Sequence, residues 1–173
     1  QANGQDVEVF AQRFDATGAK IGAEFQVNSA TAGSQFGADV ARLSDGGFVV
    51  SWEVQANAGT EQILARRFDS AGNAVGAEIT VFSAAANLRG TSITALAGGG
   101  FAVSWINDTG SNDDFVARAY DGSGAAMGDA FTINQSDSGF RSITNGAATT
   151  LANGNVLFTW DGPAASPADI YQR

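Results

Sequence analysis

An acidic loop at residues 107–114, with the sequence NDTGSNDD, carries the side chains best suited to binding a cation. Hard cations such as calcium take about six to eight oxygen ligands from flexible loops of this composition. No EF-hand spacing is present, so a merely polar hairpin end is the alternative interpretation. We predict that any calcium ion bound by this chain lies in this loop, at Asp108, Asn112, Asp113 and Asp114.

Carboxylates near predicted strand ends are the other candidates for chemistry. Glycoside hydrolysis needs two carboxyl groups a few ångströms apart, and an all-β domain can bring distant acids together. Asp39, Glu53 and Asp161 have suitable positions, but none of them stands in a recognisable motif. The chain has no histidine and no cysteine, which removes catalytic triads and thiolate metal sites. We therefore predict that the chain is not an enzyme, with a polysaccharide-degrading enzyme as a distant alternative.

Three tryptophans, Trp52, Trp105 and Trp160, each follow a similar run: GGFVVSW, GGFAVSW and GNVLFTW. Exposed rings of this kind could stack on sugars, as in a lectin. Buried rings would instead pack between neighbouring units, where a large aromatic contributes much of the core. Because each tryptophan ends a similar strand sequence, we favour a scaffold role for the three tryptophans.

Two Arg-Phe-Asp segments place charges on one face of a strand, since residues two apart point the same way. Arg13 with Asp15, and Arg67 with Asp69, could form ion pairs within a unit or with the next unit. The alternative, which we favour, is a solvated face beside an aspartate that begins a turn.

Repeated hairpins are the elements that must position these residues. The tryptophans recur at intervals of 53 and 55 residues, and a leucine stands nine residues before each one: Leu43, Leu96 and Leu151. Between each leucine and its tryptophan lies an Asp-Gly, Gly-Gly or Asn-Gly pair, and such pairs suit two-residue hairpin turns. A second repeated hairpin begins at AQRFDATG, ARRFDSAG and ARAYDGSG. Each unit thus supplies four antiparallel strands, and helix periodicity is absent.

This pattern predicts an all-β fold of repeated four-stranded antiparallel blade-like units, similar to a β-propeller, with a β-trefoil as the alternative. We divide the single repeat region into a half unit at 1–34, units at 35–86 and 87–138, and a partial unit at 139–173. VEVFAQR and DIYQR occupy the same repeat position. We therefore expect the array to continue in further units of the same polypeptide or in another copy.

The run VFAQRFDATGAKIGAEFQVNS, followed by ARLSDGGFVVSW, resembles tandem repeats of very large secreted proteins of proteobacteria. Many of those proteins also carry RTX-type calcium-binding repeats. The resemblance implies an extracellular or cell-surface module with an adhesive role. The third unit departs from the pattern because Ala119 replaces the arginine, and the RTX nonapeptides are missing, so their calcium binding does not transfer.

The net charge and the length of the apolar stretches limit the classes of partner that the chain could bind. The formal net charge of −9 opposes binding to nucleic acid. No apolar stretch reaches the roughly 20 residues of a membrane-spanning helix, so membrane insertion is not expected. The predicted function is a non-catalytic extracellular repeat module of a large bacterial secreted or surface protein, serving adhesion or assembly. A carbohydrate-binding lectin module, with a glycan as its partner, is the alternative.

Overall fold

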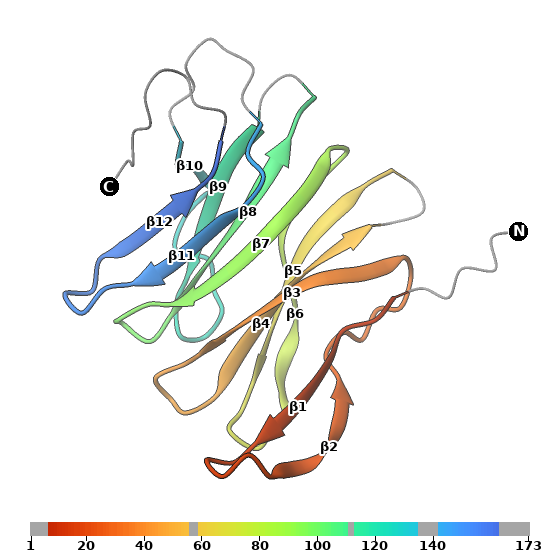
Figure 1. Cartoon of the computed structure of the whole chain (residues 1–173), viewed down its shortest axis with the longest axis vertical. Helices are drawn as coiled ribbons and strands as arrows, with labels where there is room; N and C mark the ends of the chain where they lie inside the picture. The colour runs from red at the N-terminus through yellow and green to blue at the C-terminus, as the bar shows by residue number, and fades with distance from the viewer. Residues whose placement is uncertain (1–6, 56–58, 111–112, 135–141, 163–173) are drawn as a thin grey trace, which may run out of the picture.

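The computed structural model describes residues 7–55, 59–110, 113–134 and 142–162, and Figure 1 shows the course of the chain. The regular elements in these residues are β-strands joined mostly by short hairpin turns. In chain order they are β1 (Phe10–Phe14), β2 (Lys20–Gln26), β3 (Ser34–Arg42), β4 (Phe48–Gln55), β5 (Glu61–Phe68), β6 (Ala74–Ala84), β7 (Asn87–Ala95), β8 (Phe101–Asp108), β9 (Asp113–Tyr120), β10 (Phe131–Thr132), β11 (Gly146–Thr150) and β12 (Val156–Trp160).

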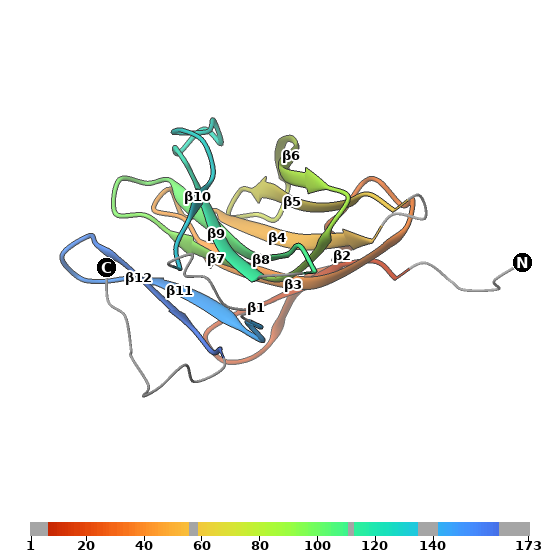
Figure 2. The same cartoon turned by 90° about the horizontal axis from the view of Figure 1, so that it is seen from above.

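The strands form four antiparallel sheets. Two are four-stranded, with the orders β3-β4-β5-β6 and β10-β9-β8-β7, and two are the hairpins β1-β2 and β11-β12. This confirms the predicted all-β fold of repeated four-stranded blade-like units, and a β-trefoil is not needed to explain it. Strand β7 lies beside β3 and β11, so the sheets follow one another in chain order (Figures 1 and 2). In the described residues we find no helix that could cross a membrane.

The tryptophan hairpins turn through three-residue loops rather than the predicted two-residue turns. Leu43 N donates to Gly47 O and Gly46 N donates to Leu43 O, and the same pair of bonds recurs in the next two hairpins. Gly46, Gly99 and Gly154 have φ values of 87°, 88° and 88°. A type I turn followed by one residue in the left-handed region needs a single glycine at that position, which explains the correction.

Each core cluster lies between neighbouring sheets, because alternate side chains of a strand face opposite units. On β4, Val49 packs toward the β7–β10 sheet, whereas Val50 and Trp52 pack against Val9 and Val27 of the β1–β2 hairpin. A third cluster joins β8 and β9 to the β11–β12 hairpin. The units are therefore held together by their faces.

The predicted scaffold tryptophans differ in burial. Trp52 and Trp105 are completely buried, as expected, but Trp160 on β12 is only partly buried. The hairpin leucines also differ, since Leu43 is buried and Leu151 is 42% exposed. In the described residues, the β11–β12 hairpin packs against a neighbouring sheet on one side, so side chains that face the other way remain accessible.

Candidate functional site

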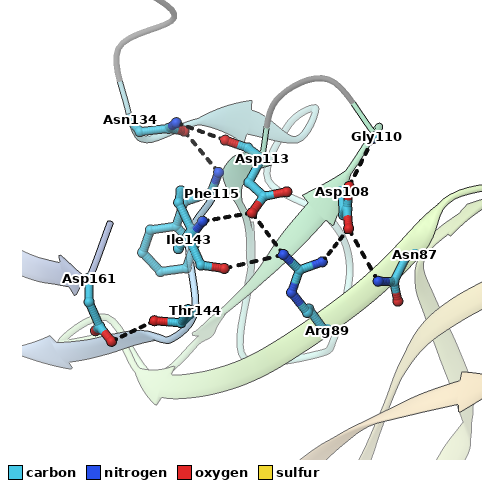
Figure 3. Close-up of polar contacts among 10 residues, drawn as sticks. All are labelled: Asn87, Arg89, Asp108, Gly110, Asp113, Phe115, Asn134, Ile143, Thr144 and Asp161. Atoms are coloured by element: carbon cyan, nitrogen blue, oxygen red, sulfur yellow. Dashed lines mark hydrogen bonds and ion pairs between the residues drawn. The ribbon is translucent and has the colours of Figure 1, made fainter. Parts of the chain in front are cut away.

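The acidic loop closes the β8–β9 hairpin, and its two flanking aspartates converge on one arginine (Figure 3). Asp108 ends β8 and Asp113 begins β9, and the two residues are paired in the ladder. Arg89 Nη1 lies 2.7 Å from Asp108 Oδ2, and Arg89 Nη2 lies 2.7 Å from Asp113 Oδ2. One guanidinium therefore holds both carboxylates, a geometry for which its fixed fork of donors is suited.

A bulge in β7 places Arg89 at this site. The β7–β8 register shifts between Arg89 and Ser92, and Gly90 within the bulge has a φ of 64°. A Cβ at Gly90 would lie 3.0 Å from Ile106 Cδ1, so both the backbone conformation and the close packing favour glycine.

Asp113 is the more buried of the two acids, at 5% exposed. Its Oδ2 also accepts a 2.6 Å hydrogen bond from Ile143 N, and Arg89 Nη2 donates to Ile143 O at 3.3 Å. The cluster thus connects the β8–β9 hairpin to the start of the following unit. A buried carboxylate with this set of charged and neutral donors is well satisfied.

Asp108 lies nearer the surface. Its Oδ1 accepts a 2.8 Å bond from Gly110 N, and its Oδ2 also accepts a 3.3 Å bond from Asn87 Nδ2. The hydrogen bond from Gly110 N, followed by the one from Arg89, lowers the pKa of Asp108 below its ordinary value. The carboxylate is therefore held in its charged form.

The structure brings together two of the four predicted cation ligands, Asp108 and Asp113. Asp114 lies opposite Asn107 in the ladder, and Asn112 lies outside the described residues. Within the described ranges, no group of three or more acidic, histidine or cysteine side chains is arranged to hold a metal ion. Calcium binding at this loop stays a prediction.

Sequence reasoning missed Arg89, although a signal existed. Aligning the units places Arg89 at the position of Phe36 in the preceding unit and Thr144 in the following one. A charge that appears in one unit only, in the same unit as an acidic loop, is the pattern that could have indicated the pair.

Asn134 and Asn28 serve as matched backbone caps beside the third strand of their units. Asn134 Oδ1 accepts a 2.8 Å bond from Phe115 N and its Nδ2 donates to Asp113 O at 3.1 Å. Asn28 Oδ1 accepts a 3.0 Å bond from Val9 N in the same repeat position. These two asparagines are structural elements of the repeat.

The candidate catalytic carboxylates Asp39 and Glu53 both bind the next unit. Glu53 is 4% exposed and accepts a 3.0 Å bond from Thr91 N on β7. Asp39 Oδ2 accepts bonds from Ile93 N at 2.9 Å and from Ser92 Oγ at 3.1 Å. Burial raises the pKa of Glu53, and the hydrogen bond from Thr91 acts in the opposite direction. Both carboxylates therefore act as acceptors between units.

Asp161 lies apart from this pair, beside the β11–β12 hairpin. Its Oδ2 accepts bonds from Asn145 Nδ2 at 3.0 Å and Thr144 Oγ1 at 2.8 Å, and these bonds lower the pKa of Asp161. The third candidate carboxylate thus caps the ends of its own hairpin.

The aspartates of the two Arg-Phe-Asp segments stabilise turns, as the favoured interpretation expected. Asp15 Oδ1 accepts bonds from Thr17 N at 2.8 Å and Ala19 N at 2.9 Å, and Asp69 Oδ1 accepts one from Asn73 N at 2.8 Å. Hydrogen bonds from residues of these turns, led by the side chains of Thr17 and Asn73, lower the pKa of both carboxyls. Arg67 forms an ion pair with Asp45 of its own unit, with Nη2 3.1 Å from Oδ2. Arg13 and Arg67 also donate to carbonyl oxygens of the following unit, as described below.

A groove of about 410 Å³ separates the β1–β2 hairpin from the β3–β6 sheet. Phe10 of β1 and Val9 just before it line one side, and Val40, Phe48 and Val50 line the other. Phe10 is 55% exposed and Val40 is 60% exposed. This groove is the second candidate site, and its lining is mainly apolar.

No protein-family model matches the chain, and no curated protein matches it. Among solved structures, the Hadza microbial sialidase Hz136 is similar, with a TM-score of 0.57 and 12% sequence identity over 73% of this chain and 32% of the sialidase. The chain spans about a third of the length of that protein. The likeness to this sialidase, a β-propeller, agrees with the blade-like architecture and shows the fold alone.

Proposed function

We propose that the chain is a non-catalytic, extracellular repeat module of a large bacterial secreted or surface protein, and that it serves adhesion or assembly. The observation that carries this proposal is a set of contacts between units that recurs along the chain. Residues that the repeat reproduces join one unit to the next. The resemblance to secreted proteobacterial repeats supports the extracellular location.

The first recurring contact joins an arginine to the following turn. Arg13 Nη1 donates to Ser70 O at 2.8 Å, and Arg67 Nη1 donates to Ser123 O at 3.3 Å. The two arginines occupy one repeat position, and both acceptors lie in the equivalent turn, although Ser70 is one residue and Ser123 two residues after the turn aspartate. Ala119, at the same position in the third unit, has no side chain that could make this contact. The contact between an arginine and the following turn thus recurs in the first two units.

The second recurring contact joins the first residue of a third strand to the beginning of the following unit. Glu61 Oε2 accepts a 2.6 Å bond from Leu88 N, and Asp113 Oδ2 accepts a 2.6 Å bond from Ile143 N. These acids satisfy backbone donors that would otherwise be unpaired at the joint. Asp39 and Glu53 also accept hydrogen bonds from the following unit. These four carboxylates therefore hold neighbouring units together, which supports a non-catalytic role.

Carbohydrate binding is the second candidate function, and the groove favours it. Phe10 offers an exposed ring, while Gln12, Arg13 and Asp39 add polar groups to the lining. Sugar sites commonly combine an aromatic face with a few polar partners. The similar solved structure is named as a sialidase.

Beads coated with the chain test the proposal. We expect them to aggregate without added glycan, and we expect the chain not to hydrolyse fluorogenic glycosides. Glycoside turnover that disappears in Glu53→Gln or Asp39→Asn would reject the non-catalytic role. Non-aggregating beads together with glycan-array binding that is lost in Phe10→Ala, but kept in the matched variant Phe131→Ala, would select the lectin instead.

A further inference from the structure

We propose that the groove beside β1 is the binding site of a tryptophan hairpin from a preceding repeat unit of the same polypeptide. The tryptophan hairpins described above are β3–β4, β7–β8 and β11–β12. With β1 and β2, the incoming hairpin completes a four-stranded blade like β3–β6 and β7–β10. This inference rests on the proposed repeat-module function and identifies a surface through which units join.

The groove leaves apolar positions of the β3–β6 sheet uncovered. Val40 of β3 is 60% exposed, whereas its repeat equivalent on β7, Ile93, is 5% exposed. Phe48 on β4 is partly buried, whereas its equivalent on β8, Phe101, is completely buried. The same apolar positions are therefore covered on one sheet and uncovered on the other.

The covered sheet shows which element fills this place. Leu43 and Val49, from the tryptophan hairpin of the preceding unit, belong to one core cluster with Ile93 and Phe101. A hairpin of the same kind in the groove would bring its own leucine and valine over the uncovered positions of the β3–β6 sheet. The proposed contact is thus the joint between units that the structure already contains, repeated once more.

An aromatic ring on β1 lacks the partner that its equivalents have. Phe14 is 55% exposed, whereas Phe68 and Tyr120, at the same repeat position, are 3% and 2% exposed. Phe68 stacks on Phe48 and Tyr120 stacks on Phe101, with ring centroids 5.1 Å and 5.0 Å apart. Both partners lie on the tryptophan hairpin of the same unit, so a hairpin beside β1 would supply the missing ring.

The backbone edge of β1 fits the same register. Its equivalents β5 and β9 pair with β4 and β8, while β1 pairs only with β2 in the described part of the chain. Val27 N donates to Val9 O, so the backbone groups of Phe10, one residue further, face the free edge. Leu64, at the position of Phe10, lies opposite Trp52. Repeat equivalence therefore places Phe10 opposite the tryptophan of the incoming hairpin.

A glycine determines which hairpin fits. A Cβ at Gly47 would lie 2.4 Å from Phe68 O, and the same close approach recurs in the next unit. A hairpin that pairs with β1 therefore needs glycine at this position, because a side chain would collide with Phe14 O. The β11–β12 hairpin carries Asn155 there, and the other two tryptophan hairpins already pair with β5 and β9. A second copy of the chain thus offers no suitable hairpin, which favours a preceding unit.

The sequence shows how to add such a unit. Residues 1–3 and 55–57 share the sequence QAN, and the two segments are 54 residues apart (55 − 1), as are Phe10 and Leu64 (64 − 10). A copy of residues 34–54 joined directly before Gln1 therefore reproduces the natural spacing from a tryptophan hairpin to the next strand. We call this product the extended chain.

Amide exchange in dilute protein tests the pairing. In the extended chain, the amides of Phe10, Gln12 and Phe14 should exchange at least about fivefold more slowly than in the unextended chain, the factor for one net hydrogen bond. Gly47→Val in the copied hairpin should remove this protection. Arg42→Val in the copied hairpin, exposed on β3, is the matched control and should keep it.

Cross-linking tests the register, since the chain has no cysteine of its own. Ser51 lies opposite Ala65, which is the repeat equivalent of Ala11. Ser51→Cys in the copied hairpin should therefore form an intramolecular disulfide with Ala11→Cys on oxidation. Arg13→Cys in place of Ala11→Cys is the control, because it lies two residues off register, about 7 Å along the strand.

A groove variant keeps the test independent of how the copied hairpin folds. Val40→Asp should leave the urea midpoint of the unextended chain unchanged, because the site is exposed, and should lower that of the extended chain, where the site is covered. Met127→Asp, 66% exposed and outside the groove, should change neither midpoint.

Protection that the added hairpin does not increase, equal cross-linking at both cysteine positions, or equal effects of Val40→Asp in both chains would overturn the proposal. Protection of β1 that rises with the concentration of the unextended chain would assign the groove to a second copy instead. Beads coated with the unextended chain test the assembly function separately, so failure of this pairing is distinguishable from failure of that function.

Discussion

At the residue scale, the repeated tryptophans are not equivalent. Trp52 Nε1 donates to Gln35 Oε1 at 2.9 Å, whereas Trp105 Nε1 finds no hydrogen-bond partner among the described residues. The residue equivalent to Gln35 is Leu88, whose side chain has no hydrogen-bond acceptor. The buried ring at Trp105 therefore contributes through packing, including its contact with Phe82 at 5.1 Å between centroids.

Replacing Trp105 with alanine should cost about 3–5 kcal/mol of unfolding free energy, the range for removing a large core aromatic. Trp160→Ala should cost less, because its ring is only partly buried. Urea unfolding followed by circular dichroism measures both changes. Equal midpoints for the two variants, or a midpoint unchanged in Trp105→Ala, would contradict the scaffold role.

Glu53 should make stability depend on pH in an unusual direction for a carboxylate. Burial raises the pKa of Glu53 in the folded chain, so the folded state holds this proton more tightly than the unfolded state. The associated stability is fully present below the unfolded pKa of about 4.3, and is lost as pH rises through the folded pKa.

The Glu53→Gln variant isolates this effect. The unfolding free energy of the variant minus that of the unchanged chain should increase as pH rises from about 4, whatever constant offset the amide introduces. Glu24→Gln, exposed on β2, serves as the matched control. A difference that stays flat or falls with pH would show that Glu53 is not destabilised by burial.

At the element scale, the β7 bulge and the β8–β9 hairpin depend on each other. The bulge presents Arg89, and the hairpin presents the two aspartates that need a positive charge between them. Because the guanidinium already supplies that charge, the hairpin needs no bound cation to balance Asp108 and Asp113.

Arg89→Gln tests this dependence and the calcium prediction together. We expect a loss of about 1–3 kcal/mol, because Asp113 loses a buried charged partner. If the loop can ligate calcium, the freed carboxylates should bind it more tightly in this variant, and calcium should restore part of the lost stability. Thermal unfolding and calorimetric titration measure both effects.

Arg42→Gln, at an exposed position on β3, is the control for the change in net charge. Calcium that leaves Arg89→Gln unaffected would reject the loop as a cation site. Stability unchanged in the variant would show that the ion pairs contribute nothing.

At the scale of the whole molecule, core packing and strand pairing are unevenly distributed among the sheets. The two four-stranded sheets share the largest core cluster, whereas the β1–β2 and β11–β12 hairpins each contribute one face and keep one strand edge without a partner in the described residues. Regions with few buried contacts and exposed backbone groups open most readily.

Hydrogen exchange should follow this arrangement. Amides of β4 and β8 are expected to exchange slowest, and those of β1 and β12 fastest, in dilute protein. Uniform protection of all strands in dilute protein would contradict this uneven distribution of packing and pairing.

Much of the fold follows from the sequence because its signals are local. Period-two alternation, turn glycines and the spacing of Trp52, Trp105 and Trp160 predict hairpins and blade-like units from neighbouring residues alone. The prediction of two-residue turns was wrong, because an Asp-Gly pair such as Asp45-Gly46 suits both two-residue and three-residue hairpin loops. Turn length depends on which strand residues pair, and that is set by the hydrogen bonds of the ladder.

The sites depended on tertiary structure, because each one joins residues that no spacing rule connects. Arg89 meets acids 19 and 24 residues further along the chain, and Arg13 reaches a carbonyl 57 residues away. The exposure of Leu151 and Trp160 likewise depends on which sheet faces them. The residues of a repeat predict how each unit folds, whereas contacts across the faces and edges of the units decide what those residues do.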